Sequence, residues 1–239
     1  MEKEIWKERA ENYNKLQWVN DDNLNKSLLD FMQLQGNHTV LSAGIGTGMF
    51  AKLIVPFVHK VYGVDGSQDM VDLIDEQSIF TKISDLRDIP FEDNFFDRII
   101  FRHVLHHCCG YVSKCIDEAY RVLKPDGKII ICESVPVNNL CVSDFSQIVS
   151  VKENRLVFTD EDLLRLLFRF KDVQETNVLL QDQSIDDWLS NCGVSKDIYK
   201  RTMDAHLRSS DKYRSSANMK IKGKDITVNM RFMAVRGQK

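Results

Sequence analysis

Thr39-Val-Leu-Ser-Ala-Gly-Ile-Gly-Thr-Gly-Met-Phe-Ala51 is the stretch of sequence that most constrains the fold of this chain. A β-prone run, residues 39–43, precedes glycines at positions 44, 46 and 48 and then helix-compatible residues, an order that predicts a strand, a tight turn and a helix. Glycine suits such a turn because it reaches backbone angles closed to other residues and lets a ligand approach the main chain. The free N–H groups at the helix start would face the turn, so we interpret the stretch as a candidate nucleotide-binding turn.

Two other interpretations of this glycine turn stay open at this point. Glycine-rich turns after strands also serve purely structural roles. In addition, Gly46, Gly48 and Ala51 fit a relaxed dinucleotide-binding spacing, and Asp65 lies close to the expected place of the acid that binds the ribose. The sequence after this turn is needed to distinguish these interpretations.

Length, composition and charge limit the class of protein. The 239 residues fit one α/β domain, without a linker or an internal repeat. A formal net charge of −3 and a pI near 6.1 argue against a broad nucleic-acid-binding surface and favour a small-molecule partner. The N-terminus does not resemble a secretory signal, no apolar run approaches ~18 residues, and the six cysteines form no C-x-x-C pair. We therefore expect a cytoplasmic protein with reduced thiols and no membrane contact.

Strand-like and helical patterns alternate along most of the chain. Strands are expected at residues 60–65, 79–84, 95–101, 128–133 and 172–180. The alternation implies a parallel sheet with helices on both faces, and a final strand within 225–235 is too close to the C-terminus for another crossover. We predict an α/β fold with a doubly wound, mostly parallel seven-stranded sheet, an antiparallel last strand and a helical lid insertion before that strand.

Polar residues stand at the carboxyl ends of successive predicted strands, where open α/β sheets bind their ligands. Asp65 could hold a ribose diol, and Asp85 could accept a hydrogen bond from an adenine amino group while the N–H of Leu86 donates to a ring nitrogen. Arg102 and His103 end the next strand. These are contacts to adenosine, and they require no pyrophosphate.

Over about residues 36–135 the chain resembles the class I S-adenosylmethionine-dependent methyltransferases. The motifs that carry the resemblance are V-L-S-A-G-I-G-T-G at 40–48, V-Y-G-V-D-G-S at 61–67, D-L-R-D-I-P-F at 85–91, F-F-D at 95–97, V-L-H-H at 104–107 and R-V-L-K-P-D-G at 121–127. The last three have no counterpart in the dinucleotide-binding pattern. The resemblance implies methyl transfer from S-adenosylmethionine to a small-molecule acceptor; the alternatives are a non-catalytic regulatory protein that binds the cofactor and an RNA methyltransferase.

The resemblance also implies a set of residues that bind the cofactor. They are Ser42, Ala43, Gly44, Gly46, Asp65, Gly66, Met70, Asp85, Leu86, Arg102 and His107. One position departs from the family pattern, because an acidic residue usually stands where this chain has Ser42. A serine cannot make the same charged contact to the methionine amino group, so either binding is weaker or a backbone carbonyl near Phe101 or Arg102 replaces that contact.

The acceptor side is expected to include histidines and aromatic residues. His103 and His106 are candidates for a catalytic base or for orienting the acceptor, although ordinary loop histidines are an equally good interpretation. Their spacing, with the neighbouring cysteines, does not match common zinc sites, so we predict no metal. Trp6, Tyr13, Trp18 and His206 are candidate substrate-binding residues, with simple core packing as the alternative for the aromatic side chains.

The predicted layout is one methyltransferase domain spanning residues 1–239. Its parts are an N-terminal helical cap (1–35), a cofactor-binding core (36–135), a helix and strand that complete the sheet (136–183), a helical lid insertion (184–220) and the last strand (221–239). The cap and the insertion are expected to close together over the carboxyl edge of the sheet as a lid. Neither the oligomeric state nor the acceptor can be derived from these residues.

Overall fold

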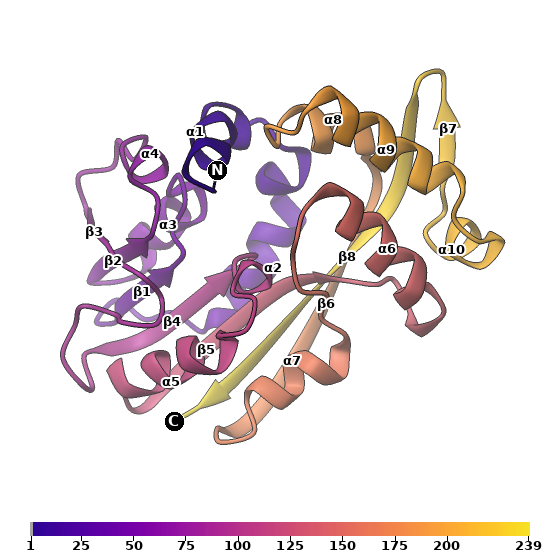
Figure 1. Cartoon of the computed structure of the whole chain (residues 1–239). Helices are drawn as coiled ribbons and strands as arrows, with labels where there is room; N and C mark the ends of the chain where they lie inside the picture. Colours follow the sequence, from indigo (N-terminus) through magenta and orange to yellow (C-terminus); the bar gives the residue numbers. More distant parts are fainter. Residues whose placement is uncertain (1) are drawn as a thin grey trace.

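The computed structural model describes the backbone of residues 2–239 and the side chains from Trp6 onward, with the exception of Glu8 (Figure 1). The strands are β1 (Thr39–Ala43), β2 (Lys60–Asp65), β3 (Ile79–Ile83), β4 (Phe96–Arg102), β5 (Leu123–Val135), β6 (Lys171–Ser184), β7 (Lys220–Lys222) and β8 (Asp225–Gln238). The α-helices are α1 (Glu2–Tyr13), α2 (Asp22–Met32), α3 (Met49–Ile54), α4 (Gln68–Val71), α5 (Val112–Val122), α6 (Val142–Lys152), α7 (Asp160–Leu166), α8 (Ile185–Ser190), α9 (Lys196–Leu207) and α10 (Asp211–Ser216). Short 3₁₀ turns occur at η1 (Gln17–Asn20), η2 (Val55–Phe57), η3 (Leu105–His107) and η4 (Asn139–Cys141).

The sheet has the strand order β3-β2-β1-β4-β5-β8-β6. Strands β1 to β5 pair in parallel, whereas β8 lies antiparallel between β5 and β6. The predicted doubly wound sheet with an antiparallel last strand is therefore confirmed. The three-residue strand β7, which the sequence did not predict, adds a short hairpin to β8.

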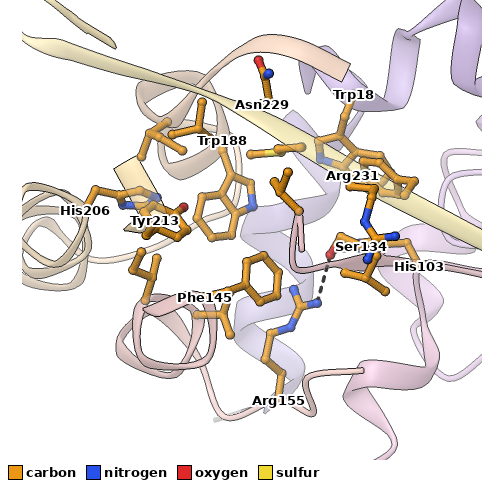
Figure 2. A pocket seen from close by; sticks show the side chains of 18 residues that line it. Trp18, His103, Ser134, Phe145, Arg155, Trp188, His206, Tyr213, Asn229 and Arg231 are labelled. Carbon is orange, nitrogen blue, oxygen red and sulfur yellow. Dashed lines mark hydrogen bonds between the residues drawn. The ribbon is translucent and has the colours of Figure 1, made fainter. Parts of the chain in front are cut away.

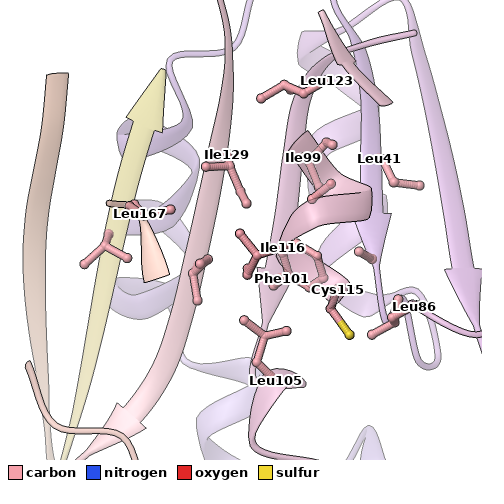
Figure 3. Packing of buried hydrophobic residues seen from close by; sticks show 14 of the residues in the cluster. Leu41, Leu86, Ile99, Phe101, Leu105, Cys115, Ile116, Leu123, Ile129 and Leu167 are labelled. Carbon is pink, nitrogen blue, oxygen red and sulfur yellow. The ribbon is translucent and has the colours of Figure 1, made fainter. Parts of the chain in front are cut away.

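Apolar side chains cover both faces of the sheet. On one face, residues such as Leu41, Phe101 and Ile129 pack beneath α5 and α7 (Figure 3). On the other face, Val40 and Ile100 pack against η1, α2 and α3. Because the chain order reverses between β1 and β4, the carboxyl ends of these two neighbouring strands form the place where such sheets bind ligands.

Helix starts follow the capping residues in the sequence. The carboxylate of Asp21 accepts a hydrogen bond from Leu24 N at the start of α2, and Ser67 accepts one from Met70 N at the start of α4. Thr159 and Asp162 form a reciprocal capping box on α7.

No helix of the described chain is both long and apolar enough to cross a lipid bilayer.

A separate apolar cluster joins the helices at one end of the sheet. Helices α8 to α10 come from the predicted insertion, but α6 also packs against α9, although it precedes β6 in the chain (Figure 1). Ile148 of α6, Leu189 of α8 and Tyr213 of α10 share this cluster with Ile226 and Val228 of β8. The division of the chain at residues 184 and 220 remains a proposal, and α6 belongs spatially with the insertion.

Candidate functional site

The glycine turn lies against the end of β2. Gly44, Gly46 and Gly48 have φ values of +71°, +56° and +75°, in the left-handed region that favours glycine. The amides of Gly44 and Ile45 donate to Val64 O at 2.8 and 3.0 Å. A Cβ on Gly44 would come within 2.4 Å of Val104 Cγ2, whereas a Cβ on Gly46 would meet nothing within 4 Å. The turn is therefore closely packed at its first glycine and open at its second.

Asp65 closes this turn from the end of β2. Its Oδ2 accepts from Gly46 N at 2.8 Å, and its Oδ1 accepts from Ser67 N at 2.9 Å. Each carboxylate oxygen keeps a second acceptor position, so the side chain can also accept from the two hydroxyls of a ribose. Burial raises the pKa of Asp65, although these backbone donors oppose the shift. A Cβ on Gly66 would also meet nothing within 4 Å, so there is open space beside the carboxylate.

The predicted adenine-binding residues follow β3. The carboxylate of Asp85 accepts from Arg87 Nε at 2.9 Å and from Arg87 Nη2 at 2.6 Å, and these hydrogen bonds hold the pKa of Asp85 below its usual range. An adenine amino group would have to share Asp85 with Arg87. Leu86 is buried, and Met70 of α4 is 2% exposed.

Ser42 and Arg102 lie on the same face of neighbouring strands. Ser42 is buried and pairs with Ile100, which is two residues before Arg102. The guanidinium of Arg102 donates to Asn25 Oδ1 at 2.9 Å and packs over Phe50 and Trp18. Its Nε is shielded from solvent and has no hydrogen-bond partner among the described residues. Where the family pattern has an acid, this chain thus has a serine next to an incompletely satisfied cation.

Residues 103–107, which follow β4 and which we name the histidine loop, are held in place by Glu133 of β5. Oε1 of this completely buried carboxylate accepts from Val104 N at 3.0 Å and Leu105 N at 2.7 Å, and Oε2 contacts His106 Nδ1 at 2.7 Å. His106 is 1% exposed, so the geometry favours an anchoring role over that of a base that reaches the acceptor. His103 Nε2 lies 3.1 Å from Ser134 Oγ, and its φ of +55° is unusual for a residue with a side chain.

Burial lowers the pKa of all three histidines in this loop. The pKa of His103 and of His106 lies well below the ordinary value, and that of His107 is about 4. These imidazoles are therefore neutral near pH 7. As a neutral side chain of low basicity, His103 is better suited to orienting an acceptor than to removing a proton from a weak acid.

Among the described residues, two groups of possible metal ligands share His106. One contains His103, His106 and Glu133, the other His106, His107 and Glu153, with the ligand atoms of each group within 4.8 Å of one another. The hydrogen bonds described above already use the carboxylate of Glu133. Around Glu153, Arg9 Nη2 lies at 2.7 Å, Lys152 Nζ at 3.0 Å and Arg155 Nη1 at 3.7 Å. Because three cations surround the second group, a metal cation would be repelled, and we propose none.

A pocket of about 630 Å³, including its open mouth, lies beside His103 (Figure 2). His103 and Ser134 lie at one end of it, Trp188 and Phe145 in the middle, and His206 and Tyr213 at the other end. The remaining lining residues are Trp18, Val135, Val137, Ile148, Val149, Arg155, Ile185, Val228, Asn229, Met230, Arg231 and Phe232. We name this space the acceptor pocket.

The four predicted substrate-binding residues occupy different places. Trp18 and His206 line the acceptor pocket. Tyr13 packs edge-to-face on Trp18, and Trp6 packs edge-to-face on His107, with Arg9 over its indole ring. Tyr13 and Trp6 therefore contribute to the cover of the site rather than to the lining of this pocket.

Comparisons with known proteins point to methyltransferases. Residues 41–131 match a family model described as Methyltransferase domain. The chain is 24% identical over 223 residues to the uncharacterized methyltransferase YcgJ of Bacillus subtilis, and the match covers 87% of each protein. The crystal structure of that YcgJ protein matches the fold with a TM-score of 0.77 at 21% identity, over 92% of this chain and 99% of that one.

Two methyltransferases whose names state a substrate also resemble this chain, one over about half of it and the other over most of it. The demethylmenaquinone methyltransferase of Oceanobacillus iheyensis is 27% identical over 119 residues, which cover 46% of this chain and 50% of that protein. The Haemonchus contortus phosphoethanolamine N-methyltransferase 2, solved in complex with S-adenosyl-L-methionine, has a TM-score of 0.65 at 18% identity, over 94% of this chain and 56% of that one. Together, these matches support a class I S-adenosylmethionine-dependent methyltransferase domain in this chain, with S-adenosylmethionine as the cofactor.

The sequence did not single out Glu133 or Arg155. Glu133 lies within the apolar strand β5, and its importance follows from the loop after β4, which comes into contact with it only in the folded chain. Arg155 lies between α6 and α7, where no local pattern distinguishes it from other surface-type arginines. The one available signal for Glu133 was a charged residue inside an otherwise apolar strand.

Proposed function

We propose that this protein transfers the methyl group of S-adenosylmethionine to a small molecule bound in the acceptor pocket. The observation that carries the proposal is the position of His103. This residue directly follows β4, which pairs with β1, the strand that leads into the glycine turn, and it also lines the acceptor pocket. Trp18 connects the two regions as well, since it packs against Arg102 and lines the pocket.

The residues of the chain fit the cofactor. Bound S-adenosylmethionine supplies an electrophilic methyl group, and transfer forms a bond from an acceptor lone pair as the carbon–sulfur bond breaks and its electron pair stays on sulfur. The open space over Gly46 and Gly66 gives room for the adenosine part next to Asp65. We assign the unpaired Nε of Arg102 to the methionine carboxylate. His103 and Ser134 would orient the acceptor, and the apolar walls would exclude water.

The function is tested by incubating the protein with methyl-labelled cofactor and a fractionated metabolite extract. Label in a small molecule supports the proposal. Label only in RNA would favour an RNA methyltransferase, and binding of the cofactor without transfer in any fraction would favour a regulatory protein.

Calorimetry with two adenosine ligands can separate the roles of Asp65 and Arg102. Asp65→Ala is expected to weaken the binding of both S-adenosylhomocysteine and 5′-methylthioadenosine by at least about tenfold, because both contain the ribose diol. Arg102→Met is expected to weaken only S-adenosylhomocysteine by about tenfold, since methylthioadenosine has no carboxylate.

The two variants are each other's controls, and thermal melting confirms that both are folded. Equal losses for both ligands in Arg102→Met would remove Arg102 from the carboxylate site. Unchanged affinities in Asp65→Ala would remove Asp65 from the ribose site.

We also propose that the N-terminal segment and the helical insertion form a lid. Gln17 N donates to Asp187 Oδ2 at 2.9 Å, Ser184 N donates to Gln17 Oε1 at 3.1 Å, and Arg9 Nε donates to Cys192 O at 3.2 Å. The segment also contacts the glycine turn, because Thr47 Oγ1 donates to Asn14 Oδ1. These contacts tie both parts of the proposed lid to each other and to the cofactor side.

Removing residues 1–13 is expected to abolish turnover and to leave much of the cofactor affinity, because Asp65 and the glycine turn remain. A deletion up to residue 19 would also remove Leu16 and Trp18, which are 0% and 5% exposed, and would damage the core. In the full chain, limited proteolysis within residues 1–20 should slow when S-adenosylhomocysteine is added. Full turnover of the truncated protein, or cleavage that does not respond to the ligand, would show that the lid proposal is wrong.

A further inference from the structure

The acceptor pocket contains a buried cation, Arg155, that makes no short contact with the residues that the structure describes. The side chain of Arg155 is 3% exposed, and Figure 2 shows it pointing toward Ser134. Its Nη2 donates to Ser134 Oγ at 3.4 Å, its Nε to Leu156 O at 3.5 Å, and its Nη1 lies 3.7 Å from Glu153. Charge-assisted hydrogen bonds are usually about 2.7–2.9 Å long. The guanidinium has therefore lost its hydration without gaining a strong partner.

The neighbouring carboxylates cannot balance this charge. Glu153 makes its shorter contacts with Arg9, at 2.7 Å, and with Lys152, at 3.0 Å. Glu133 is occupied by the histidine loop, as described above. Among the described residues, the region thus holds three cations, Arg9, Lys152 and Arg155, and two carboxylates, Glu153 and Glu133, while the three histidines of the loop are neutral. An anion in the pocket would meet a net positive field in a place of low solvent content.

Arg231 offers a useful contrast within the same pocket. Its guanidinium pairs with Asp160 and donates to Asn177 Oδ1 at 3.0 Å and Pro136 O at 2.9 Å. Its hydrogen-bonding capacity is therefore largely used. Among the described cations that line the pocket, Arg155 is the one whose contacts are all long.

The middle and the far end of the pocket indicate the chemistry of the rest of the ligand. Trp188 and Phe145 provide flat apolar walls in the middle. At the far end, His206 Nδ1 contacts Thr202 O at 2.9 Å, which leaves its Nε2 as an acceptor. The pocket therefore has a cationic end next to His103, an apolar middle and a far end that accepts hydrogen bonds.

We infer that the acceptor is a small apolar or aromatic acid whose oxyanion binds Arg155 and Ser134 next to the transferred methyl group. This inference rests on the proposed function, since it takes the pocket to be the acceptor site. A carboxylate is the simplest group of this chemistry, because it can accept from the guanidinium and from the Ser134 hydroxyl together.

The test uses calorimetry on the full chain saturated with S-adenosylhomocysteine, with carboxylate–amide pairs of the same shape as probes. The pairs are cinnamate and cinnamamide, phenylacetate and phenylacetamide, and octanoate and octanamide. At least one carboxylate is expected to bind at least about tenfold more tightly than its amide, because only the anion is attracted by the guanidinium. Arg155→Gln should lose that preference and keep its affinity for the amide.

Matched variants separate this contact from general effects of charge and folding. Arg208→Gln removes an exposed cation from the helical insertion and should keep the preference, and Arg155→Lys should retain part of it. The inference is overturned if no carboxylate binds more tightly than its amide, or if a folded Arg155→Gln protein keeps the preference. Binding of S-adenosylhomocysteine and label transfer from the cofactor are measured independently, so a failure here is distinct from a failure of the proposed function.

Discussion

Acidification from pH 7.5 to pH 5 is expected to lower the free energy of unfolding by at least about 4 kcal/mol, because buried histidines are kept neutral in the fold. Burial lowers the pKa of His107 and of His206 to about 4. In the unfolded chain both pKa values return to about 6.5, so the unfolded state binds protons first as the pH falls. Each residue then contributes about 2 kcal/mol of destabilisation at pH 5. Burial also lowers the pKa values of His103 and His106, so these residues add to the loss.

Urea unfolding at a series of pH values measures this effect. His206→Gln should reduce the loss between pH 7.5 and pH 5 by about 2 kcal/mol. Carboxylates contribute little in this range, because their unfolded pKa values are near 4. A stability that stays constant down to pH 5 would contradict the neutral buried histidines.

Glu133→Ala is expected to cost about 3 kcal/mol of folding stability, and with it the shape of the histidine loop. The substitution removes the acceptor of the amides of Val104 and Leu105 and the partner of His106 Nδ1. All of these groups lie in or at the edge of the protein interior, so water cannot fully replace the carboxylate. Turnover should fall as well, because the loop begins at His103.

Glu133→Gln is the matched control for the size of this effect. Its amide oxygen can still accept from the backbone amides, while its NH₂ group would require the other tautomer of His106. We expect a loss of about 1 kcal/mol in urea unfolding. If Glu133→Ala were as stable as Glu133→Gln, the carboxylate would not be holding the loop.

The cofactor half of the molecule could be predicted because its signals are local. The glycines at 44, 46 and 48 determine their own turn, and Asp65 follows directly from the strand that precedes it. The apolar runs also determine which strands are buried, and the short spacing before the C-terminus requires an antiparallel last strand. Each of these predictions depends on residues within a few positions of one another.

The acceptor half could not be predicted in the same way. Arg155 enters the pocket because α6 packs on α9 and carries the following loop with it, and this contact joins segments far apart in the sequence. The anchoring of His106 similarly requires Glu133, which is 27 residues away. The composition of a loop does not reveal which distant side chains it will meet, so candidate residues for this side could be predicted but their roles could not.

The indole of Trp18 separates the two ligand sites with a single side chain. The ring packs near Arg102, and it also lines the acceptor pocket beside Phe232. A ligand that restricts the motion of this ring in one site therefore also orders part of the wall of the other site. Cofactor and acceptor should therefore bind with positive cooperativity, and thermodynamic linkage requires that each ligand raise the affinity for the other by the same factor.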